Sequence, residues 1–114
     1  MKIIGTGSSL PSLSVTNEML SVFLDTSDEW IRSRTGILER RIISDENLKD
    51  LAIEASQKAL DDAGLTGSEL DYIICSNVVN YYVTPSISCL VAGGIQAACP
   101  CVDLNAACTG FLYC

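Results

Sequence analysis

The most constraining feature of the sequence is the segment Leu70–Val79 (LDYIICSNVV), which is apolar along almost its whole length. A strand of this kind is typical of a parallel sheet, where helices cover both faces. Before it, apolar positions recur every three or four residues between about 47 and 63, and Gly64 is a natural helix stop. After it, Thr84-Pro85 predicts a helix over 84–92, and Cys101–Asn105 predicts another strand. Strands that alternate with helices indicate a layered α/β fold.

The first part of the chain predicts shorter elements, each marked by a local start or stop signal. A β-branched run that ends in glycine predicts a strand, and polar residues that can accept the first amides of a helix predict helix starts. The expected elements are a strand over Lys2–Gly7, a helix capped by Thr16 and Asn17 and reaching Phe23, a helix that begins within Asp25–Ile31 and ends at Gly36, and a strand over Ile37–Ile43.

Charge and composition exclude several functional classes. The chain has 14 acidic against 7 basic residues, a net charge of −7, which argues against nucleic acid or an anionic membrane as partner. No apolar run approaches the roughly 18 residues of a membrane span, and Met1–Gly5 begins no signal peptide, so we expect a soluble, cytoplasmic protein. Its six cysteines are then expected to be reduced. Because the chain has no histidine, a Ser-His-Asp triad cannot be built from it alone.

Cys108 is the candidate catalytic residue. It follows the strand Cys101–Asn105 after two alanines, where an apolar helix is expected to begin. At a helix N-terminus the unpaired amides and the helix dipole stabilise a thiolate, and Ala106, Ala107 and Gly110 leave room for a substrate. This pattern favours a nucleophilic cysteine for acyl transfer. The alternative is a small side chain buried in the core, the ordinary role of cysteine in an apolar segment.

The segment Asp25–Arg41 concentrates positive charge in an acidic chain. It holds four of the seven basic residues and the only tryptophan, Trp30. An indole can stack on a nucleobase, and guanidinium groups bind phosphates, so the segment favours a ligand that carries a nucleotide. The alternative is a solvated helix face whose arginines pair with acidic neighbours. The four arginines are Arg32, Arg34, Arg40 and Arg41.

Four groups of residues form an ordered set of motifs along the chain. They are Ile3–Ser8 with Leu10-Pro11, Asp25–Ile31 continuing through Arg34–Ile37 and Glu39–Arg41, Thr84–Ser86, and Asp103–Phe111. In this order they resemble the β-ketoacyl-acyl carrier protein synthase III family, and the resemblance covers essentially the whole chain. It implies a thiolase-like fold, in which two similar α/β halves form a layered αβαβα homodimer.

The resemblance also implies a reaction and a role for five residues. The reaction is a decarboxylative Claisen condensation of an acyl-CoA with malonyl-acyl carrier protein, which gives a 3-oxoacyl-carrier product and initiates fatty acid synthesis. Cys108 matches the acylated nucleophile, and its backbone N–H matches a donor to the thioester oxyanion. Trp30 matches the residue that stacks on the CoA adenine, Thr26 a polar contact to that base, and Arg34 a contact near the CoA phosphates. Thr84 matches the position that reaches the acyl pocket of the partner subunit, where threonine leaves room for chains longer than acetyl.

The sequence also departs from the family. The family's catalytic histidine and asparagine lie in the second half of the fold, and this chain has no histidine. We therefore expect residues 1–114 to be the N-terminal part of a condensing-enzyme domain, truncated after the nucleophile and inactive alone, with no metal and with acyl-CoA as a substrate instead of a cofactor. One alternative is another thiolase-superfamily acyltransferase, such as a polyketide or quinolone-type starter synthase. The other is a non-catalytic module, either a binding half-domain or a cysteine-rich metal or redox protein that uses Cys99, Cys101, Cys108 and Cys114, although packing is the expected role of Cys99 and Cys101.

Overall fold

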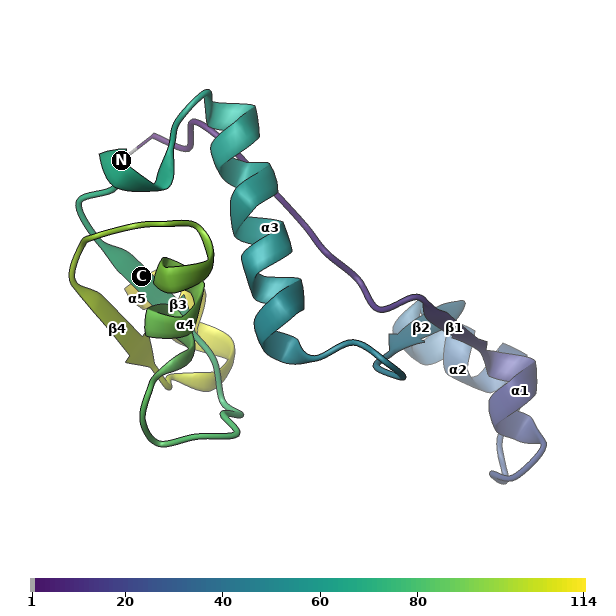
Figure 1. The fold of residues 1–114 in the computed structure, drawn as a ribbon. Helices are drawn as coiled ribbons and strands as arrows, with labels where there is room; N and C mark the ends of the chain where they lie inside the picture. Colours follow the sequence, from purple (N-terminus) through teal and green to yellow (C-terminus); the bar gives the residue numbers. More distant parts are fainter. Residues whose placement is uncertain (1) are drawn as a thin grey trace. The chain divides into compact units, whose positions relative to one another are not determined.

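The computed structural model describes residues 2–114, which divide into two compact units. One unit contains residues 2–9 and 48–114, and the other contains residues Leu10–Asn47. The elements of the first unit are α3 (Leu48–Ala63), the 3-10 helix η1 (Gly67–Glu69), β3 (Ile73–Ser76), α4 (Ile87–Gly94), β4 (Cys101–Leu104), the 3-10 helix η2 (Ala107–Thr109) and α5 (Gly110–Tyr113) (Figure 1). Those of the second are β1 (Leu13–Thr16), α1 (Asn17–Ser21), α2 (Asp28–Thr35) and β2 (Glu39–Ile42).

The first unit is built on a parallel pair of strands. β3 and β4 pair in the register Ile73↔Cys101 and Cys75↔Asp103, and α4 packs against both strands. The expected α/β alternation is therefore confirmed. The expectation that Leu70–Val79 would be a strand covered on both faces is wrong, because β3 is shorter and α4 covers only one of its faces. Burial consequently alternates along β3, and Ile74 is 42% exposed.

The core of this unit lies between α3, α4 and the strand pair. Leu60 of α3 packs with Ile87, Val91 and Ile95, and each of the four is less than 10% exposed. The amphipathic helix expected between about 47 and 63 is confirmed as α3. Gly64 ends it with φ +68°, in the left-handed region that glycine adopts without strain.

The strand expected over Lys2–Gly7 is wrong. This segment is extended but is paired with no strand in residues 2–114, and it runs along α3 instead (Figure 1). The Thr6 amide donates to the Asp62 carboxylate at 2.9 Å, and a Cβ at Gly5 or Gly7 would overlap the α3 backbone. The glycines at the end of the run therefore allow close packing against a helix.

The second unit follows its local signals closely. β1 and β2 pair antiparallel, with Val15 opposite Arg40. The Thr16 and Ser27 hydroxyls accept from amides of the first turns of α1 and α2, as expected of N-caps, although α1 ends at Ser21 instead of Phe23. Gly36 ends α2 with φ +72°. Strand β1 was not expected, because its short sequence (LSVT) gives little strand signal by itself. Its extended conformation is stabilised by pairing with β2.

Candidate active site

Cys108 lies on a tight turn between β4 and α5. Ala107 adopts φ +45°, a left-handed conformation that costs a residue with a side chain about 1–3 kcal/mol. Thr109 closes the turn, because its amide and its hydroxyl donate to the Ala106 carbonyl at 3.1 and 2.7 Å. Cys108 directly follows the strained residue and is exposed. A strand, a strained turn and a helix in succession also form the nucleophile elbow of other enzymes, where the turn presents the reactive side chain.

The helix expected from Ala106 onwards begins differently in the structure. It starts as the 3-10 turn η2 and becomes α-helical only at Gly110, so Cys108 lies within the turn. Gly110 is buried against the end of β3, where a Cβ would overlap the Ser76 hydroxyl. A methyl group here would require the Ser76 side chain to shift, so glycine lets the turn that carries Cys108 lie close to the end of β3.

Asp103 connects β4 to the start of α4. Its carboxylate accepts from the amides of Ser88 at 2.9 Å and Ile87 at 3.1 Å, and from the Asn77 side chain at 3.0 Å. Burial raises the pKa of Asp103, but the hydrogen bonds from Ser88, Asn77 and Ile87 outweigh it and lower the pKa overall. The carboxylate therefore stays charged and satisfies two amides of the first turn of α4.

The same carboxylate explains a difference from the sequence prediction for α4. The helix expected over 84–92 begins later than Thr84-Pro85, because its N-cap is Ser86, whose hydroxyl accepts from the Cys89 amide at 3.3 Å. Asp103 fixes this start through the next two amides. Thr84 precedes the helix, is exposed, and lies in the same compact unit as Cys108.

The second unit contains a pocket that brings together two of the predicted substrate-binding residues. Thr26 and Trp30 line it, and its volume is about 890 Å³. The Thr26 hydroxyl is buried and has no hydrogen-bond partner among residues 2–114. Because an unpaired buried hydroxyl is costly, this atom marks a place where a ligand could supply the missing bond. The remaining lining residues are Leu20, Leu24, Asp25, Ser27, Ile31 and Arg40.

Arg34 lies over the exposed indole of Trp30. Its guanidinium carbon is 4.6 Å from the ring centroid, a cation–π contact. The structure thus places Arg34 beside Trp30, although Arg34 does not itself line the pocket. The alternative of a solvated face with paired charges holds in part, because Arg41 lies 3.7 Å from the Glu39 carboxylate.

Two of the other cysteines, Cys75 and Cys101, are partly buried. Burial raises the pKa of Cys75 and of Cys101, and the neighbouring Cys89 and Cys99 raise that of Cys101 further. Within residues 2–114 no group of three or more cysteine or acidic side chains is arranged to hold a metal ion. In the same residues, no helix is long and apolar enough to cross a membrane.

Two residues of these sites were missed from the sequence. Asp103 was read only as part of a motif, and Arg40 only as one of four arginines. Alternation along the expected strand could have predicted that Arg40 and Arg41 lie on opposite faces, because neighbouring side chains of a strand point in opposite directions. The contacts of Asp103 join segments that are distant in sequence, so no local pattern carries them.

The chain was compared with known proteins. No family model matches it. It is similar to the β-ketoacyl-[acyl-carrier-protein] synthase III of Clostridium perfringens (strain SM101 / Type A), with 54% identity over 113 residues, which cover 98% of this chain and 35% of that protein. The synthase III of Clostridium acetobutylicum is 49% identical over 114 residues, which cover 99% and 35%.

Solved structures give the same result. The 3-oxoacyl-[acyl-carrier-protein] synthase III from Aquifex aeolicus VF5 matches with a TM-score of 0.94 and 45% identity, over 98% of this chain and 37% of that one. The priming β-ketosynthase from the R1128 polyketide biosynthetic pathway matches with a TM-score of 0.93 and 36% identity, over 98% and 34%. The chain thus spans about 35% of the length of the curated relatives.

Proposed function

We propose a function from the premise that this chain is homologous to the β-ketoacyl-[acyl-carrier-protein] synthases III and has their thiolase-like α/β fold. The chain carries the nucleophile and a coenzyme A subsite of such a synthase. The observation that carries this proposal is the exposed Cys108 on its strained turn. The chain corresponds to the N-terminal part of the condensing-enzyme domain. The whole enzyme is a cytoplasmic homodimer that condenses an acyl-CoA with malonyl-acyl carrier protein.

The first step is acyl transfer to Cys108. The thiolate attacks the acyl-CoA carbonyl, a new carbon–sulfur bond forms, and the bond to coenzyme A sulfur breaks, so that coenzyme A leaves and takes up a proton. The Cys108 amide donates to the oxygen that becomes negative during the attack. The turn supports this step, since Cys108 is exposed and the preceding Ala107 carries only a methyl group.

The second step is the condensation. Malonyl-acyl carrier protein loses carbon dioxide, its carbanion attacks the carbonyl of the acyl-cysteine, and Cys108 leaves as thiolate while the carbon–carbon bond forms. The histidine and asparagine that assist this step in the family have no counterpart among residues 1–114, which contain no histidine. We therefore propose that residues 1–114 alone do not complete the condensation, so that they are inactive as a synthase although Cys108 can still take up an acyl group.

The pocket of the second unit supports the proposed coenzyme A subsite. Trp30 offers an indole face for the adenine, and the unpartnered Thr26 hydroxyl offers a hydrogen bond to the base. Arg34, which lies over the indole, is free to swing to a phosphate when the base stacks. Acyl-CoA is here a substrate, and the proposal requires no cofactor and no metal.

Intact-protein mass spectrometry after brief incubation with acetyl-CoA tests the proposed acyl transfer. We expect one acetyl group on the chain, its absence in Cys108→Ser, and its persistence in Cys89→Ser, which removes another exposed cysteine. Acetylation that survives Cys108→Ser would refute the assignment. Longer acyl-CoAs test Thr84, because they should acylate the native protein faster than a Thr84→Phe variant in the assembled enzyme.

A second candidate function is starter-unit priming in polyketide synthesis, favoured by the match to the R1128 priming ketosynthase. Both functions use Cys108, and they differ in the acceptor. A chimera that joins residues 1–114 to the remaining part of the Clostridium perfringens relative allows the condensation to be measured. Use of malonyl-acyl carrier protein but not malonyl-CoA supports the fatty acid synthase, and the reverse preference supports another thiolase-superfamily enzyme.

A further inference from the structure

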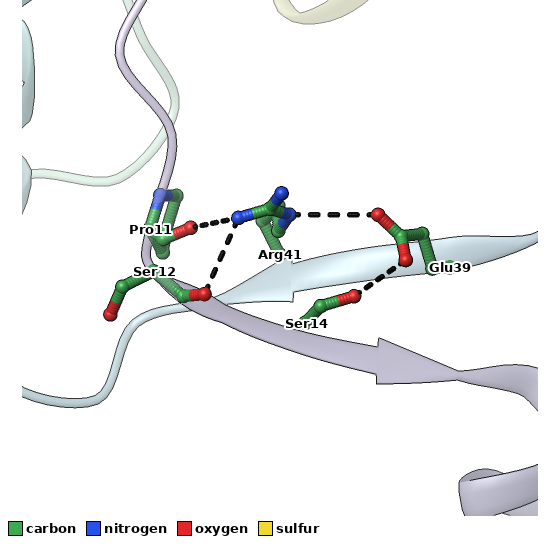
Figure 2. Close-up of polar contacts among 5 residues, drawn as sticks. All are labelled: Pro11, Ser12, Ser14, Glu39 and Arg41. Atoms are coloured by element: carbon green, nitrogen blue, oxygen red, sulfur yellow. Dashed lines mark hydrogen bonds and ion pairs between the residues drawn. The ribbon is translucent and has the colours of Figure 1, made fainter.

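Two neighbouring arginines of β2 have different surroundings. Arg41 is engaged within the protein: its Nη1 donates to the carbonyls of Pro11 and Ser12 at 3.1 and 3.3 Å, and its Nε lies 3.7 Å from the Glu39 carboxylate (Figure 2). Glu39 in turn accepts from the Ser14 hydroxyl at 2.7 Å. The charge of Arg41 is thus paired, and its Nη1 is hydrogen-bonded, within its own unit.

Arg40 is held in place but keeps an unpaired charge. Its Nη1 donates to Oδ1 of Asn17 at 3.0 Å, and within residues 2–114 no carboxylate lies in ion-pairing range of it. Asn17 is fully buried, and its amide nitrogen donates to Asp28 at 2.8 Å and to the Ile37 carbonyl at 2.7 Å. Because both amide hydrogens are used, the side-chain oxygen of Asn17 is fixed towards Arg40. Because Arg40 is only half-buried, its guanidinium can offer the four further N–H donors to a ligand.

Arg40 lines the pocket that also contains Thr26 and Trp30. The pocket therefore combines a guanidinium without a counter-ion, a buried hydroxyl without a partner, and an aromatic face. These groups match a ligand with a planar ring and a phosphate, which a guanidinium can bind through two parallel hydrogen bonds. Asp25 also lines the pocket and repels an anion, so the phosphate is expected at the Arg40 side.

We propose that Arg40, held by Asn17, binds a phosphate group of the nucleotide ligand while Trp30 stacks on its base. This rests on the proposed function, in which coenzyme A occupies the pocket, and it adds a phosphate-binding residue to that subsite. Arg41 has no such role, because its charge is paired with Glu39 and it does not line the pocket.

Titrations followed by the emission of Trp30, the only tryptophan, test the proposal on the 114-residue chain. The ligands are coenzyme A, 3′-dephospho-coenzyme A and adenosine, and the variants are Arg40→Gln and the matched Arg41→Gln. Arg40→Gln should weaken coenzyme A binding about tenfold or more, the usual effect of losing a charge-assisted hydrogen bond, and should leave adenosine binding unchanged. Arg41→Gln should weaken coenzyme A binding less than about twofold. A smaller loss for 3′-dephospho-coenzyme A would assign Arg40 to the 3′-phosphate, and an equal loss would assign it to the pyrophosphate.

The remaining outcomes separate this proposal from the proposed function. Equal effects of the two variants on coenzyme A binding, or no effect of Arg40→Gln, would overturn the role of Arg40 and leave the coenzyme A subsite standing. If the native chain binds neither coenzyme A nor adenosine, the proposed coenzyme A subsite fails. Calorimetric titration with inorganic pyrophosphate then tests whether Arg40 still forms an anion-binding site. Binding that is lost in Arg40→Gln keeps the site, and no binding overturns it. Should Arg40→Gln fail to fold, Arg40→Lys replaces it, because lysine keeps the charge but cannot form the two parallel hydrogen bonds. Arg40→Lys should then weaken coenzyme A binding more than the matched Arg41→Lys, and equal effects would overturn the role of Arg40.

Discussion

Replacing Asp103 with asparagine should release the start of α4 and weaken the unit that carries Cys108. One carboxylate oxygen accepts from the Ser88 amide, and the other accepts from the Ile87 amide and the Asn77 side chain. Because asparagine keeps only one acceptor oxygen, at least one donor must face the new NH2 group. The bonds that survive also become neutral.

The size of the effect follows from these contacts. Hydrogen bonds to charged groups contribute about 1.5–3 kcal/mol each, and a buried donor left unpaired costs about 1–3 kcal/mol. Since Asp103 is only half-buried, the lower end of this range applies, and we expect a loss of about 2 kcal/mol of unfolding free energy. For a unit of this size, that loss lowers Tm by roughly 8–16 °C.

Amide hydrogen exchange gives the most direct assay. The Ile87 and Ser88 amides should lose protection in Asp103→Asn, and thermal unfolding should report the loss of stability. Asp71→Asn is the control, since Asp71 is exposed in the same unit. Because the native pKa of Asp103 is lowered, its stabilisation is present above the ordinary aspartate pKa and is lost as pH falls through the native pKa. Equal effects of the two variants, or a difference from the native protein that does not shrink at low pH, would refute this reasoning.

Two further predictions concern single contacts. Gly110→Ala should cost about 1–3 kcal/mol of unfolding free energy and slow the acylation of Cys108, because the new methyl group overlaps the Ser76 hydroxyl. Adding Ser76→Ala should restore part of the stability and part of the acylation rate. A double variant no better than Gly110→Ala would contradict the steric cause. Hydrogen bonds from the Ser12 side chain and amide, and then from its own amide and that of Ser44, lower the pKa of Glu46 from 4.5 to about 2. The stability that Glu46 gives to residues Leu10–Asn47 is therefore complete above about pH 4.5 and is lost as pH falls towards 2. Unfolding followed by circular dichroism should show this pH dependence in Asp45→Asn but not in Glu46→Gln.

Local signals in the sequence predicted the helical elements well. The periodicity before Gly64 predicted α3, and the hydroxyl of Ser27 and the glycine at position 36 bound α2 much as expected. Caps and stops act over one or two helical turns, so they can be read without knowing what packs against the helix. The same holds for the order of strands and helices from α3 to α5.

The strands were predicted less well, because their extent depends on partners. The apolar run after Leu70 gave a strand, but its burial depends on α4, which covers one face only. The segment Lys2–Gly7 has strand-like residues, yet its polar contacts are with α3. Strand β1 was not predicted, because it is recognised only by its pairing with β2. A strand satisfies its backbone groups through another segment, which sequence pattern alone does not identify.

The sequence by itself determined which residues carry the chemistry. Cys108 between small residues and the tryptophan among arginines were both visible as residue types at a spacing. Only the tertiary structure decided how these residues are held. Ala107, next to Cys108, has a left-handed backbone conformation, and Gly110 lies against Ser76. The Asp103 carboxylate accepts from the first amides of α4. It also engaged Arg41 within its unit while Asn17 held Arg40 at the pocket. The reason is that a side chain's chemical type is local, whereas its exposure, its hydrogen-bond partners and its unpaired charge arise from contacts between segments far apart in the chain.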